Sequence, residues 1–225
     1  MTMLLEKERL QVAKTALAMW QTGLVINTSG NVSIRVADKV VITPSGFSYE
    51  GLEARDVLVV NMQGDSVSGD LVPSSEMPLH LSVYAADPRI RAIVHTHSVY
   101  ATAVSTLVKE LPAIHYQIAD LGGPVPVAPY QTFGSVELAA SVTDAIRGRT
   151  AALMKNHGAL TIGDSVEQAL ARTITLEWLC RVYLIASQSG TPSLVDEEEL
   201  ERVLLQQMRL AAAQQRRLHA RGPRE

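Results

Sequence analysis

The spacing of hydrophobic residues along the chain predicts a mixture of helices and strands. Apolar positions recur at helical spacing over residues 3–22, where Gly23 offers a stop, and again over 77–86, 99–108, 135–148, 165–187 and 196–217. Alternating or continuous apolar runs predict strands over 32–36, 39–43, 56–62, 92–97, 125–128, 151–155 and 159–162. The order lacks a regular strand–helix–strand alternation. We therefore expect an α/β fold in which helices layer a central, mainly antiparallel sheet.

The length of 225 residues suits one domain with a sizeable core, so we expect a single domain over 1–225. Its tail, from about residue 208, is polar and basic, and we expect a loose end there. No strand leads into a G-x-G-x-x-G segment, which argues against a dinucleotide-binding fold.

Charge and composition narrow the class of protein further. The net charge of −3 argues against a nucleic-acid partner, and no apolar run approaches the length needed to cross a membrane. Charged residues interrupt the first ten positions, where a secretory signal would have its apolar core. The sole cysteine, Cys180, suits a reducing compartment. These features predict a cytoplasmic protein.

Two histidines close the predicted strand Ala92–His97, in the stretch I-V-H-T-H. Side chains alternate along a strand, so His95 and His97 leave it on the same face. A lone histidine in an apolar context, such as His80 or His115, is more often a buried hydrogen-bonded residue than a metal ligand. A pair on one face is a stronger signal, and His157 adds a third histidine at another strand end.

Three histidines and one carboxylate form a suitable ligand set for zinc. Glu76, in the first turn of the predicted helix 77–86, is the candidate carboxylate. The alternative is that Glu76 is an ordinary acidic residue that interacts favourably with the helix dipole.

Small polar residues gather in three places and suggest an anion pocket. They are Thr28-Ser29-Gly30-Asn31, Thr43-Pro44-Ser45-Gly46 and Ser74-Ser75. Ser74 or Ser75 is the expected N-cap of the helix 77–86, where free N–H groups and the dipole favour a phosphate. Each cluster alone is better explained as an ordinary turn or a capping serine. Their joint occurrence beside Glu76 leads us to expect a phosphate pocket next to a metal.

These segments resemble the class II aldolases of the L-fuculose-1-phosphate aldolase type. That superfamily also includes ribulose-phosphate 4-epimerase and the adducin head domain. The similar stretches are T-S-G-N-V-S (28–33), I-T-P-S-G (42–46), P-S-S-E (73–76), I-V-H-T-H (93–97), L-P-A-I-H-Y (111–116), A-P-Y-Q-T-F-G (128–134) and N-H-G (156–158). They follow the order of the family over about residues 10–190.

The resemblance implies a role for each matching residue. His95, His97 and His157 would bind one zinc ion per subunit, with Glu76 as a movable fourth ligand and acid–base. The phosphate would be held by Gly30, Asn31, Ser45, Gly46, Ser74 and Ser75. Phe133 would position the aldehyde part, and Tyr116 would act as proton donor in the site of a neighbouring subunit. The resemblance also implies a homotetramer with sites at its interfaces.

Other readings stay open from the sequence alone. Lys155 precedes His157 by two and would share its side of an extended strand, so a Schiff-base aldolase is the rival chemistry. An epimerase of the same superfamily is a second alternative, because it uses an acidic residue near the position of Tyr116 and Asp120 lies nearby in the sequence. An adducin-like interaction domain is the non-enzymatic alternative. The fuculose enzyme carries a tyrosine in its C-terminal tail, whereas residues 208–225 have none. Aldolases for 5-methylthioribulose or 5-deoxyribulose 1-phosphate are therefore alternatives.

Overall fold

A nine-stranded sheet forms the centre of the computed structural model, which describes residues 3–220, with the backbone alone at 215 and 217–220. The strand order is β4-β3-β2-β1-β5-β9-β8-β7-β6. Every neighbouring pair is antiparallel except β7 and β8. The strands are β1 (Asn31–Val36), β2 (Lys39–Ile42), β3 (Leu58–Asn61), β4 (Ser66–Ser68), β5 (Ala92–Thr96), β6 (Glu110–Leu111), β7 (Val125–Ala128), β8 (Ala151–Met154) and β9 (Gly158–Gly163).

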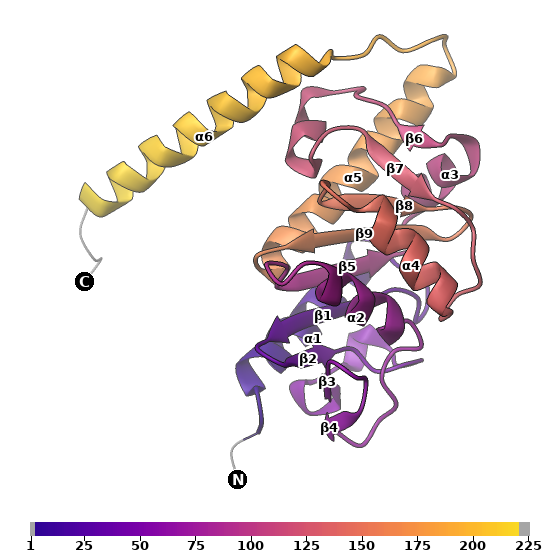
Figure 1. The fold of residues 1–225 in the computed structure, drawn as a ribbon, viewed down its shortest axis with the longest axis vertical. Coiled ribbons are helices and arrows are strands. Elements are labelled where there is room, and N and C mark those ends of the chain that lie inside the picture. The colour runs from indigo at the N-terminus through magenta and orange to yellow at the C-terminus, as the bar shows by residue number, and fades with distance from the viewer. Residues whose placement is uncertain (1–2, 221–225) are drawn as a thin grey trace.

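Helices cover both faces of this sheet (Figure 1). They are α1 (Glu6–Gln21), α2 (Met77–Ala86), α3 (Val99–Leu107), α4 (Val136–Ala145), α5 (Val166–Ser187) and α6 (Glu197–Ala220). Short 3-10 turns span η1 (Tyr49–Gly51), η2 (Ala54–Asp56) and η3 (Tyr116–Leu121). The two faces bury separate sets of apolar side chains: α2 and α4 pack on one, whereas α1, α3 and α5 pack on the other.

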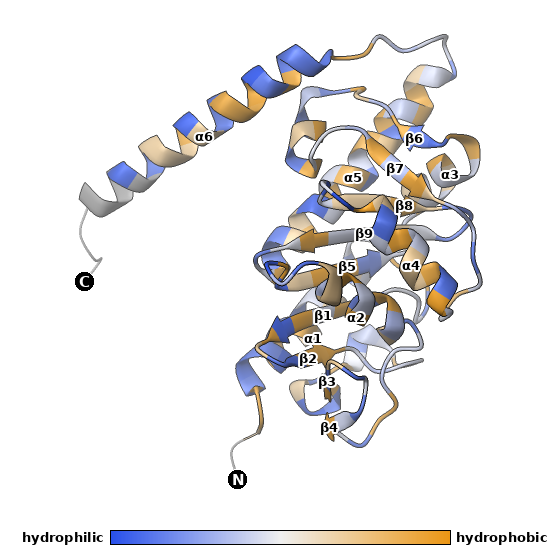
Figure 2. Ribbon diagram, in the orientation of Figure 1, coloured by the Kyte–Doolittle hydropathy of each residue, from blue (hydrophilic) through white to orange (hydrophobic). Residues whose placement is uncertain are grey.

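The alternation of side chains along the strands divides the core between the two faces. Ile93 of β5 packs with α2 and α4, whereas Val94 packs with α1. All five residues of β5 are buried, and hydrophobic residues recur along the strands of the sheet (Figure 2). This double burial explains why β5 is a continuous apolar run in the sequence. His95, two residues after Ile93, consequently faces the α2 side.

The central position of β5 determines where the histidines lie. β5 pairs with β1 on one side, with Asn31 opposite His95, and with β9 on the other, with Leu160 opposite His95. The ends of three strands and the N-terminus of α2 therefore meet near His95.

The structure differs from the sequence-based expectations in local details. The N-cap of α2 is Glu76, not Ser74 or Ser75, and its side chain makes no cap hydrogen bond. Lys155 to His157 form a turn between β8 and β9, in which Asn156 has a φ of 56°. The strict alternation expected to put Lys155 and His157 on one side does not apply in that turn. The short strands β4 and β6 were not predicted.

The C-terminal helix α6 extends from the body of the molecule (Figure 1). The helix continues to Ala220, beyond the predicted end at 217, so most of the tail expected to be loose is helical. The final residues, 221–225, lie outside the described residues. Within residues 3–220, no helix is both long and apolar enough to span a bilayer.

Candidate metal centre and substrate pocket

Glu76, His95, His97 and His157 meet at one point. One ligand atom from each lies within 4.8 Å of the others, and no other group of this kind occurs within the described part of the chain. Glu76 comes from the start of α2, His95 and His97 from β5 and its end, and His157 from the turn before β9. The structure thus brings together all four side chains that the sequence predicts as ligands.

The distances within this cluster fit a small cation. The Nε2 atom of His97 lies 3.0 Å from Nε2 of His95 and 3.1 Å from Nε2 of His157. Two nitrogens bound to one tetrahedral zinc ion lie roughly 3.3 Å apart. Glu76 completes the set, with Oε2 at 2.9 Å from His95 Nε2 and Oε1 at 3.3 Å from His157 Nε2. Oε1 is buried and has no hydrogen-bond partner among the described residues, as expected for a ligand atom.

The protonation states suit metal binding. The Nδ1 atom of His95 lies 2.9 Å from the Ala159 carbonyl oxygen, which can only accept, so Nδ1 carries the hydrogen and Nε2 is free to bind. Burial and the neighbouring charge of His95 lower the pKa of His97 to about 3. The same causes lower the pKa of His157 to about 4. Both rings are therefore neutral at pH 7 and offer a lone pair.

The Glu76 carboxylate and the His95 imidazole shift each other's pKa. Burial acts to raise the pKa of Glu76, but His95, His157 and the Asn31 amide outweigh it and hold this pKa well below the usual value. Burial acts to lower the pKa of His95, but the Glu76 carboxylate and the Ala159 carbonyl raise it. The Glu76 carboxylate thus favours a positive charge among the three imidazoles, as a bound cation would supply.

Two glycines allow the chain segments to approach this closely. A Cβ atom at Gly158 would lie 2.1 Å from the Thr96 carbonyl oxygen. Gly30 has a φ of 76°, and its Cβ would lie 2.7 Å from the His95 carbonyl oxygen. Side chains at these positions would separate the segments that carry the ligands.

A pocket of about 140 Å³ opens beside the cluster. Glu76, His97 and His157 form one part of its wall. The remaining wall comes from three loops and Phe133, and it contains every residue predicted to contact the phosphate or the aldehyde part. These residues are Gly30, Asn31, Ser45, Gly46, Ser74, Ser75 and Phe133, accompanied by Thr28, Ser29 and Pro44.

Comparison with known proteins identifies the family. A profile described as Class II Aldolase and Adducin N-terminal domain matches residues 10–184. The chain belongs to this family. It is 41% identical over 191 residues to the L-fuculose phosphate aldolase of Escherichia coli K12, covering 84% of this chain and 88% of that one. It is 37% identical over 201 residues to the 5-deoxy-D-ribulose 1-phosphate aldolase of Bacillus thuringiensis serovar kurstaki, covering 88% and 94%.

A solved structure of an L-fuculose 1-phosphate aldolase superposes with a TM-score of 0.86 at 34% identity, covering 89% of this chain and 96% of the other. The expected α/β class II aldolase fold is therefore confirmed, as is the expectation of an enzyme of the lyase class. In this chain, Glu76 and the three histidines His95, His97 and His157 form the cluster that could hold a divalent metal.

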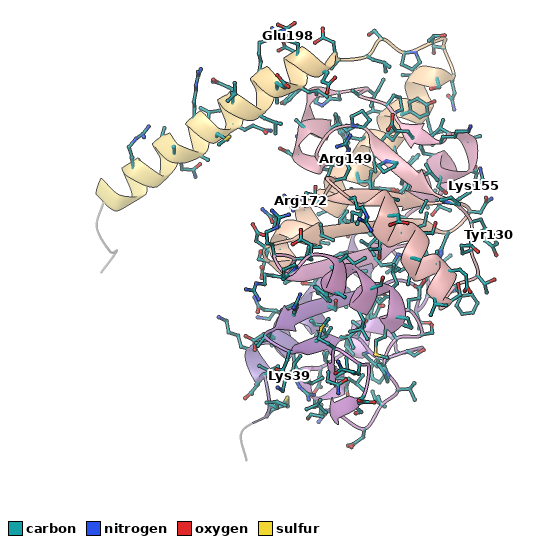
Figure 3. The ribbon with its side chains drawn as sticks, viewed as in Figure 1. Lys39, Tyr130, Arg149, Lys155, Arg172 and Glu198 are labelled. Carbon is teal, nitrogen blue, oxygen red and sulfur yellow. The ribbon has the colours of Figure 1, made fainter. Side chains whose placement is uncertain are left out.

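Tyr116 lies apart from the pocket in its own chain. It begins η3, its side chain is 50% exposed, and its ring contacts that of His115 at a centroid distance of 4.4 Å. Its predicted role in a neighbouring site stays a prediction. Lys155 is exposed and lies at the periphery of the molecule, and it does not line the pocket (Figure 3).

Sequence reasoning missed the part played by His80, which it treated as an ordinary buried histidine. His80 is fully buried and lies 2.5 Å from Asn31, whose amide in turn donates to Glu76. The signal was present as the spacing of four between Glu76, His80 and Tyr84, which places them on one face of a helix.

A larger cavity, of about 540 Å³, lies at the opposite end of β9. It is lined by four arginines, of which Arg149 and Arg172 are labelled in Figure 3, together with Asp87 and Asp164. The metal-ligating cluster does not reach it.

Proposed function

We propose that this class II aldolase uses zinc to cleave a ketose 1-phosphate, such as L-fuculose 1-phosphate, reversibly to dihydroxyacetone phosphate and an aldehyde. One observation carries the proposal. The four expected ligand side chains form one cluster, and three of them line a single pocket together with all seven residues expected to contact the phosphate or the aldehyde part. The named relatives support the class of substrate, since both act on phosphorylated ketoses by their names.

The loops would bind the phosphate through neutral donors. The pocket wall carries the hydroxyls of Ser45, Ser74 and Ser75, and Gly30 and Gly46 leave the backbone accessible. The N-terminus of α2 adds a favourable dipole. Phosphate binding would fix the substrate at a point remote from the bond that breaks, which orients the reacting carbons at the metal.

The reaction breaks the C3–C4 bond and leaves negative charge on the phosphorylated fragment. A bound divalent ion supplies a Lewis acid that offsets this charge. Glu76 would deliver the proton to C3, and its position against both His95 and His157 allows it to exchange between ligand and acid–base roles. Tyr116 of a neighbouring subunit would exchange the proton on the C4 oxygen that becomes the aldehyde, accepting it in cleavage and donating it in the reverse reaction.

This role for Tyr116 requires an oligomer, and we propose the homotetramer typical of the family. The exposed position of Tyr116 outside its own pocket supports a contribution to another subunit's site. The buried free Cys180 is compatible with the cytoplasmic location that we also propose.

A second substrate deserves equal testing, namely 5-deoxyribulose 1-phosphate. The Bacillus thuringiensis relative acts on that sugar by its name, and the present chain lacks a tyrosine in its C-terminal tail. Asp120 is the acidic residue on which the epimerase alternative depends. Its Oδ1 atom accepts a hydrogen bond from Gln207 Nε2 of α6 at 2.7 Å. An adducin-like binding role would not require the intact set of four ligands.

A panel of ketose 1-phosphates tests the proposal, with release of dihydroxyacetone phosphate coupled to NADH oxidation. We expect activity on at least one 1-phosphate, none on the sugar without phosphate, and loss of activity on chelation. Glu76→Gln should lower kcat by about 10²–10⁴. Borohydride with substrate should trap no adduct, and Lys155→Arg should retain activity. A borohydride adduct on Lys155 would establish the Schiff-base chemistry instead.

A further inference from the structure

A line of buried polar side chains leads from the core of the molecule to the metal centre. Glu76, His80 and Tyr84 follow one face of α2 at intervals of four residues, and Asn31 and Ser33 share one face of β1. All five residues are buried, with at most 5% of their surface exposed. Burying so many polar groups is costly unless they satisfy one another.

Hydrogen bonds connect all five groups in series. The Asn31 Nδ2 atom donates to Glu76 Oε2 at 3.0 Å, and Asn31 Oδ1 lies 2.5 Å from His80 Nε2. On the other side of the ring, His80 Nδ1 lies 2.6 Å from Ser33 Oγ. The Tyr84 hydroxyl lies 2.8 Å from Ser33 Oγ and 3.1 Å from the Ser33 carbonyl oxygen.

The chemistry of the groups fixes the direction of these bonds. The Asn31 amide oxygen can only accept, so His80 Nε2 must carry a hydrogen. Burial lowers the pKa of His80 to about 3, which keeps the ring neutral and leaves Nδ1 as an acceptor. Ser33 Oγ therefore donates to Nδ1, and the Tyr84 hydroxyl donates to Ser33. Every hydrogen in the series points towards Glu76.

We propose that His80, oriented by Ser33 and Tyr84, is a positioning residue that locks the Asn31 amide with its NH₂ group towards Glu76. Without the His80 donor, the amide would be held only by the attraction of its NH₂ group to the Glu76 carboxylate, and the Asn31 side chain could turn away from Glu76. Glu76 would then lose the partner that holds it in line with the histidines. The inference rests on the proposed metal centre but does not depend on which sugar is cleaved.

Zinc affinity is the direct readout, measured by competition with a chromophoric chelator. Loss of a group that orients a metal ligand typically weakens metal binding by 10–100-fold. We expect a loss in that range for His80→Leu. His80→Gln, which can place a donor near the position of Nε2, should recover most of the affinity.

The matched control is Ser82→Ala. Ser82 lies on the same helix, but its hydroxyl bonds to Thr143 at 2.9 Å and has no part in the series. This variant should bind zinc as the unmodified protein does. Ser33→Ala is the milder variant if His80→Leu does not fold, and it should weaken zinc binding about 10-fold, at the lower end of the same range.

A double-mutant cycle separates positioning from a general loss of structure. If His80 acts through the Asn31 amide, its replacement should cause no further loss of zinc affinity in an Asn31→Ala background. In the single variant, kcat should fall together with the zinc affinity. That pattern would support the inference.

Two results would overturn the inference alone. One is a folded His80→Leu or Ser33→Ala protein with unchanged zinc affinity. The other is an equal loss of affinity with and without the Asn31 side chain. Failure of the unmodified protein to bind zinc would instead overturn the metal centre itself, and with it the inference, so the two failures are distinguishable.

Discussion

Among the described glycines, Gly158 is the one at which an added Cβ atom would come closest to a backbone atom. Its position opposite the Thr96 carbonyl leaves no room for a Cβ atom, which would lie 2.1 Å from that oxygen. This close approach brings the turn that carries His157 against the end of β5, which carries His95 and His97. The candidate metal centre therefore depends on a residue that is not part of the cluster.

Gly158→Ala should destabilise the protein by about 3 kcal/mol, the upper end of the cost of overpacking. The added methyl group must move either β9 or the end of β5, so zinc affinity should fall as well. Denaturant unfolding and chelator competition measure the two effects. Gly51→Ala is the control, because a Cβ there has open space within 4 Å. Equal stability of the two variants would contradict the close approach.

His80 should make the stability of the metal-free protein depend on pH. Its pKa is lowered to about 3 by burial, whereas an unfolded histidine titrates near 6.5. Between these values the unfolded chain binds a proton that the folded chain does not, so the stability falls as the pH falls. The slope attributable to one such group is about 1.4 kcal/mol per pH unit.

Denaturant unfolding at a series of pH values checks this expectation. Replacing His80 with glutamine should remove that part of the slope between about pH 6 and pH 4, even if the variant is less stable throughout. Parallel curves for the two proteins would show that His80 does not stay neutral in the folded state.

At the scale of elements, α3 begins at Val99, shortly after His97 of the candidate metal centre, and is capped from another helix. Ser98 is its N-cap but makes no side-chain cap hydrogen bond. The Glu177 carboxylate of α5 accepts from the Tyr100 and Ala101 N–H groups instead, at 2.9 and 2.8 Å. This contact fixes the direction in which the chain leaves His97.

Glu177→Ala should cost about 1.5–3 kcal/mol of stability, the range for hydrogen bonds to a charged group. Glu167→Ala is the control from the same helix, an acid in its exposed first turn that should cost less than about 1 kcal/mol. Thermal or denaturant unfolding distinguishes them. A smaller loss at Glu177 than at Glu167 would contradict the capping role.

Most elements were predictable because their hydrophobic patterns are strong and local. The hairpin of β1 and β2 and the helix α5, capped by Ser165, appear close to where periodicity and cap residues place them. The helix α2 begins at the predicted residue, Met77, but its N-cap is Glu76 and not Ser74 or Ser75. The Glu76 carboxylate lies against His95 and His157 and makes no cap hydrogen bond. The strands β4 and β6 have only three and two residues, too few for a pattern to emerge.

The four side chains of the candidate metal centre were predictable from residue type and from their positions at strand ends and at a helix start. The His80 series was not, because it depends on the pairing of β1 with β5 and on the packing of α2 against that face. A sequence shows the spacing along α2 but not which strand lies beneath it. The place of Tyr116 also remained open, since its predicted partner is another subunit.

At the scale of the whole molecule, the proposed assembly divides each active site between two chains. In that arrangement, His97→Ala removes a metal ligand and Tyr116→Phe removes the proton donor, but from different sides of an interface. Each variant alone should lose activity by about 10² or more. Neither change should disturb the tetramer, which light scattering can verify.

Co-expression of the two variants should restore activity. Random mixing of subunits leaves about a quarter of the sites with intact groups from both chains, as expected for a heterologous interface. Recovery near that fraction would support sites shared between subunits. No recovery from verified mixed tetramers would place Tyr116 in its own chain's site or outside catalysis.

Titration of the metal-free protein with zinc tests the central claim most directly. The rate of dihydroxyacetone phosphate release from L-fuculose 1-phosphate and 5-deoxyribulose 1-phosphate is followed at each addition. We predict that activity on at least one sugar is negligible without metal, rises linearly and saturates at one ion per chain. Activity that persists without metal, or zinc bound at one ion per chain without cleavage of either sugar, would contradict the account.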